Sequence, residues 1–224
     1  LKKLHRLIVT SSTYRQDSKA SPSLLEKDPQ NRLLARGPRF RLSGELIRDH
    51  MLQASGKLSG KMFGPGVYPP QPLTVLAHAF GNKSWNASKG EDRYRRSIYT
   101  FIKRTAPFAG FMTFDGTSGE NCLAKRDRSN TPLQALTLLN DEMYLELARA
   151  AGQEVHQTKD DPIHSLFRRF LTRPPKQSET DALQDYYEQQ IQRLQKGEIK
   201  PSEIAVTPKA TPELAGKVLL ARAI

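Results

Sequence analysis

The chain has 224 residues, of which 37% are hydrophobic, and its 35 Lys and Arg against 23 Asp and Glu give a formal net charge of +12. The single cysteine, Cys122, excludes an internal disulfide and a zinc site built from cysteines. No apolar run reaches the roughly eighteen residues of a membrane span, and the low apolar share favours thin helical cores joined by polar connections.

The chain up to Gly56 contains three predicted helices. An apolar stripe at helical spacing predicts the first one, from Leu1, Leu4, Leu7 and Ile8. Asp28 as N-cap and Pro29 at the first helical position predict a second helix over 28–36. Ser43 is the candidate cap of the third helix, and Gly56 is its candidate terminator.

The middle of the chain has a different character. Residues 57–92 are rich in Pro, Gly, Asn and Ser, so we expect an irregular strap that lies over the helices. The stretch "DRYRRSIYTFIKRTAP" combines the helical period with the aromatic and β-branched content of a strand, and we favour a helix ended by Pro107. The short, turn-bounded "GFMTFDG" is the best candidate for a strand.

The stretch "RSNTPLQALTLLND", residues 128–141, begins with a complete helix start. Thr131 and Gln134 match the capping box, and Pro132 takes the first helical position. An apolar stripe continues the helix, through Leu133, Leu136, Leu139, Met143 and Leu147. Asn140 is a poor residue for a helix interior, and we expect a kink there with Asp141 capping the next turn, rather than a ligand contact.

The last third of the chain repeats these start signals. Asp161 with Pro162 predicts a helix, whose inward side consists of Ile163, Leu166, Phe167 and Phe170. The stretch "SETDALQDYYEQQIQRLQKG" predicts another amphipathic helix, and Thr211 with Pro212 predicts a last one.

These elements predict a mainly α fold: an irregular multi-helix domain with a long Pro/Gly-rich loop region and little β structure. We expect the helical domain over 1–195, with the strap at 57–92, and a Pro-rich linker over 196–211. Residues 212–224 are expected to begin a C-terminal helix that continues in a longer polypeptide.

Basic residues before the helix start suggest one local binding site. Free amides and the positive end of the helix dipole attract anions at such a start. A carboxylate, sulfate or phosphate could therefore be held by Lys125, Arg126, Arg128, Asn130 and Thr131. The alternative is a solvated basic loop, because Asp127 interrupts the cluster.

The sequence lacks a catalytic constellation, and we expect no catalytic and no metal-ligating residue. The motif that attaches haem covalently is absent, as are the nucleophile elbow, the P-loop and the dinucleotide fingerprint. The five histidines are scattered, without a pair at i and i+4 that would suit a metal. A weaker alternative is a hydrolase that uses Asp115, Glu120 or Cys122.

Long blocks spread over the chain point to a known family: "LHRLIVTSSTYRQ", "DPQNRLLARGPRFRLSGELIRD", "GEDRYRRSIYTFIKRTAPF", "FMTFDG", "RSNTPLQALTLLND" and "ELAGKVLLARAI". In these blocks the chain resembles the planctomycete-specific domain of unknown function numbered fifteen fifty-three, which is found in bacterial proteins with cytochrome-c-like domains. The resemblance implies a large periplasmic or otherwise exported protein. Haem would then be held by another domain, with no cofactor in this segment.

Two functional hypotheses follow. The first is a non-catalytic interaction or structural domain that docks other domains of the same polypeptide or outside partners. The second is a binding module for acidic, sulfated polysaccharide or another polyanion, because a large positive charge concentrates such partners. Nucleic acid is not expected, since the sequence has no basic stripe interleaved with aromatic residues.

Overall fold

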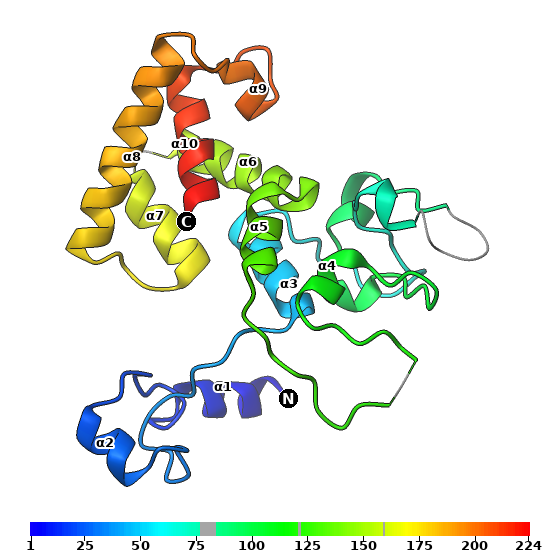
Figure 1. Ribbon diagram of the computed structural model, residues 1–224, viewed down its shortest axis with the longest axis vertical. Helices are drawn as coiled ribbons and strands as arrows, with labels where there is room; N and C mark the ends of the chain where they lie inside the picture. The colour runs from blue at the N-terminus through cyan, green and yellow to red at the C-terminus, as the bar shows by residue number, and fades with distance from the viewer. Residues whose placement is uncertain (77–83, 121, 159) are drawn as a thin grey trace. The chain divides into compact units, whose positions relative to one another are not determined.

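In the computed structural model, the described residues are 1–76, 84–120, 122–158 and 160–224 (Figure 1). They form two compact units, Leu1–Arg41 and Leu42–Ile224. Helices make up the regular structure, and within the described ranges the β structure consists of an isolated bridge between Val67 and Thr100. The mainly helical fold class predicted from the sequence is therefore confirmed.

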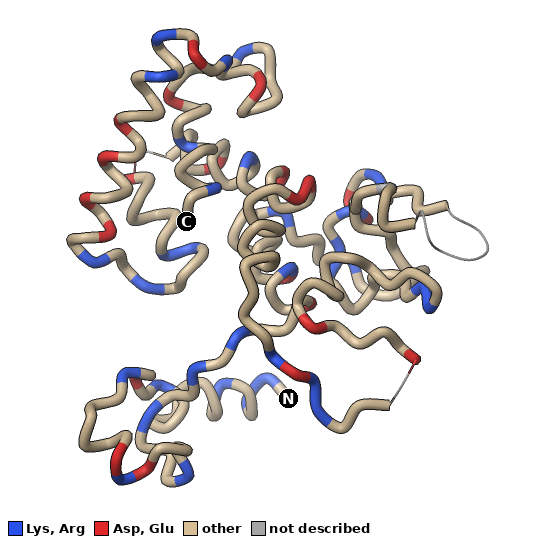
Figure 2. Tube along the Cα trace, viewed as in Figure 1, with Lys and Arg blue, Asp and Glu red and all other residues tan. Residues whose placement is uncertain are grey.

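The first unit, all of whose residues are described, contains two short helices, α1 (Lys2–Thr10) and α2 (Pro22–Lys27). Ser21 caps α2, and its hydroxyl accepts a hydrogen bond from the Leu24 amide at 3.2 Å. None of the apolar side chains in this unit is buried, so the apolar stripe of α1 adds little stability to it. The unit is strongly basic, with ten Lys and Arg against three Asp and Glu (Figure 2).

The helix predicted over 28–36 does not form, and Asp28 ends α2 instead. Its carboxylate accepts hydrogen bonds from the amides of Arg32 and Leu33, both at 2.8 Å. Asn31 takes a left-handed conformation with φ 54°, which interrupts a helix. The prediction failed because an aspartate can bridge the amides of a turn as readily as it caps a helix.

The second unit holds the remaining helices. In chain order they are α3 (Gly44–Ala54), α4 (Ala109–Thr113), α5 (Pro132–Asn140), α6 (Glu142–Gln157), α7 (Pro162–Leu171), α8 (Gln177–Gln195), α9 (Pro201–Ala205) and α10 (Pro212–Ala223). Short 3₁₀ segments lie between α3 and α4: η1 (Leu73–Leu76), η2 (Gly90–Tyr94) and η3 (Ser97–Tyr99).

One core of the second unit lies among α6, α7, α8 and α10, which pack side by side (Figure 1). Asp161 caps α7 as predicted, and the predicted inward side of that helix is buried. Helices α6 and α10 approach closely at Gly152, where an added Cβ would lie 2.7 Å from the Val218 Cα. The glycine therefore allows backbone contact between the two helices.

The stretch predicted as a linker, 196–211, contains the short helix α9, which contacts α10. Ala205 at the end of α9 is buried, and Thr211 caps α10 by accepting a hydrogen bond from the Leu214 amide at 3.2 Å. This stretch is thus packed rather than wholly irregular. The domain boundaries proposed from the sequence stay a prediction.

A second core lies where the Pro-rich strap meets α3, α4 and α6. Trp85, the only tryptophan, is buried there and donates a hydrogen bond from Nε1 to the Pro69 carbonyl at 2.7 Å. Its ring stacks on Phe108 with the ring centroids 6.0 Å apart. The described part of 57–92 is mostly irregular, as predicted, and 77–83 lie outside the described residues.

The helix predicted from "DRYRRSIYTFIKRTAP" is wrong, because this segment forms η2, η3 and extended chain. Arg48 on α3, only 1% exposed, donates hydrogen bonds to the carbonyls of Arg95 at 2.7 Å and Arg93 at 3.1 Å. Those carbonyls point toward α3 instead of bonding amides four residues further on. A long-range contact has therefore replaced a local preference.

The strand predicted from "GFMTFDG" is also wrong, since its first four residues lie in α4. Phe108, Phe111 and Phe114 recur every three residues, and the first two rings meet edge to face at 5.0 Å. That spacing places the rings on one side of a helical turn, which a strand would not do.

Helix α5 starts and ends as predicted, but its apolar stripe is not covered. Asp141 caps α6, accepting a hydrogen bond from the Met143 amide at 2.9 Å, so the chain breaks after Asn140. Three leucines of α5 that were predicted to be inward are exposed: Leu133, Leu136 and Leu139. The stripe becomes buried only in α6, from Met143 and Leu147 onward.

Candidate functional site

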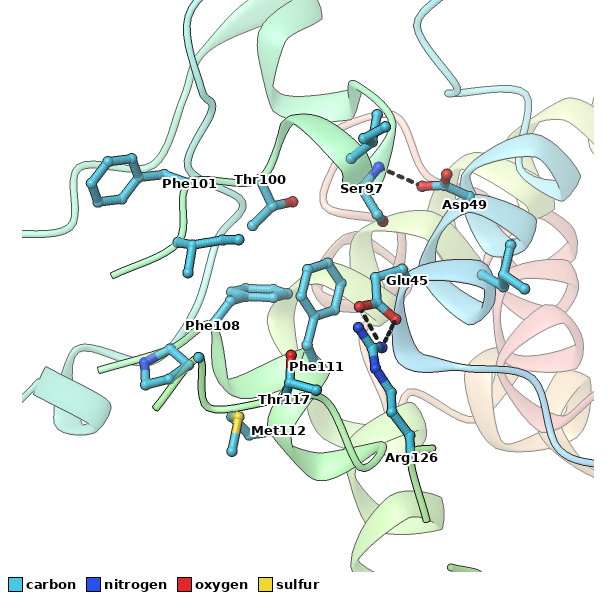
Figure 3. A pocket seen from close by; sticks show the side chains of 15 residues that line it. Glu45, Asp49, Ser97, Thr100, Phe101, Phe108, Phe111, Met112, Thr117 and Arg126 are labelled. Carbon is cyan, nitrogen blue, oxygen red and sulfur yellow. Dashed lines mark hydrogen bonds and ion pairs between the residues drawn. The ribbon is translucent and has the colours of Figure 1, made fainter. Parts of the chain in front are cut away.

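A pocket of about 470 Å³ opens in the second unit beside α3 and α4 (Figure 3). Its walls come from α3 and from three later segments that follow one another closely in the sequence: residues 97–102, residues 107–112, and the residues Thr117, Gly119 and Arg126. Pockets of this size with an apolar lining and a few polar groups are where proteins commonly bind ligands. It is therefore the candidate site.

The apolar side of the pocket combines buried and exposed side chains. Phe108 and Phe111 form the inner part. Phe108 belongs to the core around Trp85, and Phe111 packs against that core. At the outer part Ile98 is 83% exposed and Ile102 is 72% exposed. Such apolar side chains beside an open pocket are typical of a surface that a partner covers.

The polar side of the pocket lies along α3. Asp49 Oδ1 accepts a hydrogen bond from the Ser97 amide at 2.7 Å (Figure 3). The Arg48 guanidinium donates to Ser97 Oγ at 3.3 Å and lies 3.9 Å from the Asp49 carboxylate. Burial lowers the pKa of Arg48 to about 10, while Asp49 opposes that shift, so Arg48 is charged at neutral pH.

Thr100 adds an unusual polar group to the wall. The residue is 6% exposed, and within the described part of the chain its hydroxyl makes no hydrogen bond. A buried hydroxyl without a partner carries a free-energy cost of about 1–3 kcal/mol.

An ion pair closes the lower edge of the pocket. Arg126 Nη1 donates to both carboxylate oxygens of Glu45, at 2.8 and 2.9 Å (Figure 3). Burial raises the pKa of Glu45, but the hydrogen bonds and charge of Arg126 outweigh it, so the pKa lies below its ordinary value. The pair is partly exposed, so its net contribution to stability is small.

One residue of the predicted anion site, Arg126, lines the pocket. Lys125 and Asn130 are exposed, Arg126 points to Glu45, and Arg128 makes an interaction of its own. Thr131 is the N-cap of α5. Nothing tests whether these side chains hold an anion, so the anion site stays a prediction.

The helix start at Thr131 has a structural role. Gln134 Oε1 accepts a hydrogen bond from the Thr131 amide at 3.3 Å. The Gln134 side chain is buried, and its Nε2 donates to Ser129 Oγ and to the Thr113 carbonyl, both at 3.1 Å. This glutamine therefore ties the start of α5 to the end of α4, with Pro132 at the first helical position.

The residues of the weaker hydrolase alternative are not assembled into a recognisable centre. Asp115 accepts hydrogen bonds from the amide and hydroxyl of Ser129, at 2.7 and 2.8 Å, while Glu120 and Cys122 are exposed. Among the described residues, no three His, Cys, Asp or Glu side chains are grouped so that they could hold a metal ion. In the same residues, no helix has the length and apolar character needed to cross a membrane.

Sequence reasoning missed the pocket residues Asp49, Ser97 and Thr100. One signal was available, because Glu45, Arg48 and Asp49 stand at i, i+3 and i+4 and therefore share a face of α3. Charged residues on the same side as buried Leu52 point to buried polar contacts. Their partners are too distant in the sequence to be named from it.

Comparison with known proteins gives a family and no closer relative. Residues 1–187 match the family model described as "PSD1: Protein of unknown function (DUF1553)". The match ends within α8, so the block "ELAGKVLLARAI" lies outside it. No curated protein and no solved structure matches the chain. Because the matched residues make up well over half of the sequence, this chain belongs to the PSD1 family of proteins of unknown function (DUF1553).

Proposed function

We propose that this chain is a non-catalytic interaction domain that binds an apolar segment of a partner polypeptide in the pocket beside α3 and α4. The observation that carries the proposal is the continuity of the pocket with the exposed side chains of Ile98 and Ile102. A partner that covers both gains the free energy of removing apolar surface from water.

The size of that gain limits the kind of partner. Burying both isoleucines fully contributes about 3–6 kcal/mol, at about 1.5–3 kcal/mol for each side chain. Association itself costs about 4–15 kcal/mol, so contact with these two side chains alone does not hold a partner. An occupant must also fill the pocket over Phe108 and Phe111 and satisfy the polar groups on its wall.

A polypeptide suits the pocket better than a small anion does. The guanidinium of Arg126 is already neutralised by Glu45, and Asp49 adds a second carboxylate to the lining. The two carboxylates would repel an anionic head group, whereas they would not repel a polypeptide that presents apolar side chains and backbone amides.

The setting of the domain is part of the proposal and rests on the resemblance alone. We place it in an exported bacterial protein whose other domains include a haem-binding, cytochrome-c-like one, and another domain of that polypeptide is the first partner to test. The full reading frame would check this setting: an export signal and a haem attachment motif are expected, and the absence of both would contradict it.

The experiment selects random twelve-residue peptides on the full chain and measures the affinity of enriched peptides by fluorescence anisotropy. Ile98→Asp should weaken binding at least about tenfold. Val206→Asp is the matched control, since Val206 is exposed, lies outside the pocket and has a left-handed backbone that aspartate tolerates. Loss of binding in Leu136→Asp but not in Ile98→Asp would place the interaction on α5 and refute the proposal, as would a failure to enrich any peptide.

Polyanion binding is the second candidate, favoured by the basic excess of the first unit. Binding of heparin should then weaken steeply as salt is added, because it depends on charge. Neutralising Lys2, Lys3 and Arg6 together should reduce the affinity more than Lys125→Gln does. Undetectable binding at low ionic strength would remove this candidate.

A further inference from the structure

We infer that the partner segment binds as an extended strand, which pairs with the free backbone edge at 100–102 and places an apolar side chain in the pocket. This inference rests on the proposed function and adds the binding mode and the chemistry of the partner. Addition of a strand to an exposed edge is a general mode of peptide recognition, in which backbone hydrogen bonds supply affinity and pockets supply specificity.

One edge of this segment is already paired. The Val67 amide donates to the Tyr99 carbonyl and the Phe101 amide donates to the Val67 carbonyl, both at 2.8 Å. These two bonds form the isolated parallel bridge between Val67 and Thr100. The chain is therefore extended at Thr100, with Val67 along one side.

The opposite edge of the segment carries backbone groups without hydrogen-bond partners among the described residues. In an extended chain, successive residues direct their amide and carbonyl groups to alternate sides, so the Thr100 carbonyl and the Ile102 amide face away from Val67. Within the described residues, neither group makes a hydrogen bond, whereas the Thr100 amide donates to the Ser97 carbonyl at 3.0 Å. An acceptor and a donor two residues apart on one side form the pattern that an added strand completes.

The open edge and the pocket coincide. Thr100, Phe101 and Ile102 all line the pocket, and Val67 does not. Side chains alternate between the faces of a strand, so a strand paired here directs every second side chain toward the pocket over Phe108 and Phe111.

Charge indicates which strand fits. Arg96 and Arg104 are exposed, lie on either side of the edge in the sequence and make no ion pair within the described residues. Acidic side chains beyond the paired residues would be attracted to both. The partner is thus an extended segment with apolar residues two apart, flanked by Asp or Glu.

The test uses an enriched peptide and two N-methylated forms of it. Methylation of the alternate amides that face the edge should weaken binding at least about tenfold, and methylation of the other alternate amides should change it less than about threefold. In parallel, hydrogen exchange of the Ile102 amide should slow on binding, while the amide of Val206, an exposed residue outside the pocket, keeps its rate. Binding through side chains alone predicts equal effects of both methylation patterns and no protection of Ile102.

The outcomes separate this inference from the proposed function. If a peptide binds, loses affinity with Ile98→Asp, and yet tolerates both methylation patterns, the pocket is an interaction site and strand addition is wrong. If no peptide depends on Ile98, the proposed function itself fails. Enriched peptides without acidic residues would overturn the proposed charge of the partner.

Discussion

Replacing Arg48 with methionine tests whether a buried charge holds the loops of the second unit in place. The substitution keeps much of the side chain's length but removes its hydrogen bonds to the Arg95 and Arg93 carbonyls and to the Ser97 hydroxyl. A charged donor makes these bonds worth about 1.5–3 kcal/mol each, less for the long one, or roughly 4–8 kcal/mol together.

The charge removed by this substitution offsets part of that loss. Burial lowers the pKa of Arg48 to about 10, so carrying the charge at neutral pH costs about 3 kcal/mol. Hydrogen bonding therefore outweighs desolvation, and we expect Arg48→Met to lower the free energy of unfolding by roughly 1–5 kcal/mol.

Urea unfolding followed by the fluorescence of Trp85 measures this change. Trp85 is the only tryptophan and is buried in the core that Leu52 of α3 also enters, so its signal reports the affected region. Arg149→Met is the matched control, since among the described residues Arg149 donates one hydrogen bond, from Nε to the Ile204 carbonyl at 3.1 Å. If Arg48→Met unfolds at the same urea concentration as this control, the buried arginine gives no net stabilisation and the reasoning is refuted.

Three further predictions concern packing and a carboxyl pKa. Leu136→Ala on α5, where the side chain is exposed, should lower the free energy of unfolding by less than about 1 kcal/mol, while Leu147→Ala in the core should lower it by about 2–5 kcal/mol. Equal decreases in chemical unfolding would contradict the burial pattern. Gly152→Ala should lower the melting temperature, because its Cβ would collide with the α10 backbone, whereas Gly60→Ala meets no atom and should not. Backbone hydrogen bonds within its turn, chiefly that from Leu33, lower the pKa of Asp28. The ionised carboxylate therefore stabilises this turn at a pH above the ordinary pKa of Asp, and the stabilisation is lost as the pH falls through the lowered pKa of Asp28. A carbon-detected NMR titration that gives Asp28 an ordinary or raised pKa would contradict this.

Local capping signals predicted where several helices of the second unit begin, although they missed α4 and α9. Asp161 and Thr211 cap α7 and α10 by their own side chains, and the break after Asn140 follows from the aspartate next to it. These signals work because each cap bonds an amide only two or three residues away. The same kind of signal failed at Asp28, whose carboxylate bonds amides four and five residues away in a turn.

The candidate site could not be predicted in the same way. The segment around Arg95 that forms one wall has a helical period in its sequence. Its carbonyls nevertheless accept hydrogen bonds from Arg48, which lies more than forty residues earlier in the chain. Periodicity reports which residues share a face and carries no information about distant donors. The prediction that the apolar stripe of α5 is buried was wrong for a related reason. An apolar pattern predicts which residues share a helix face, but it does not show that another element covers that face.

One turn of α3 supplies the contacts that hold the polar wall of the pocket. Glu45, Arg48 and Asp49 lie on one helical face, and each one holds a different piece of backbone or loop: Arg126, the carbonyls around Arg95, and the Ser97 amide. The edge at 100–102 follows directly after these anchored residues, so its position depends on α3 more than on its own sequence. If a partner strand binds this edge as we propose, stability and binding are linked in this region, because the three side chains that hold the loops also position the edge.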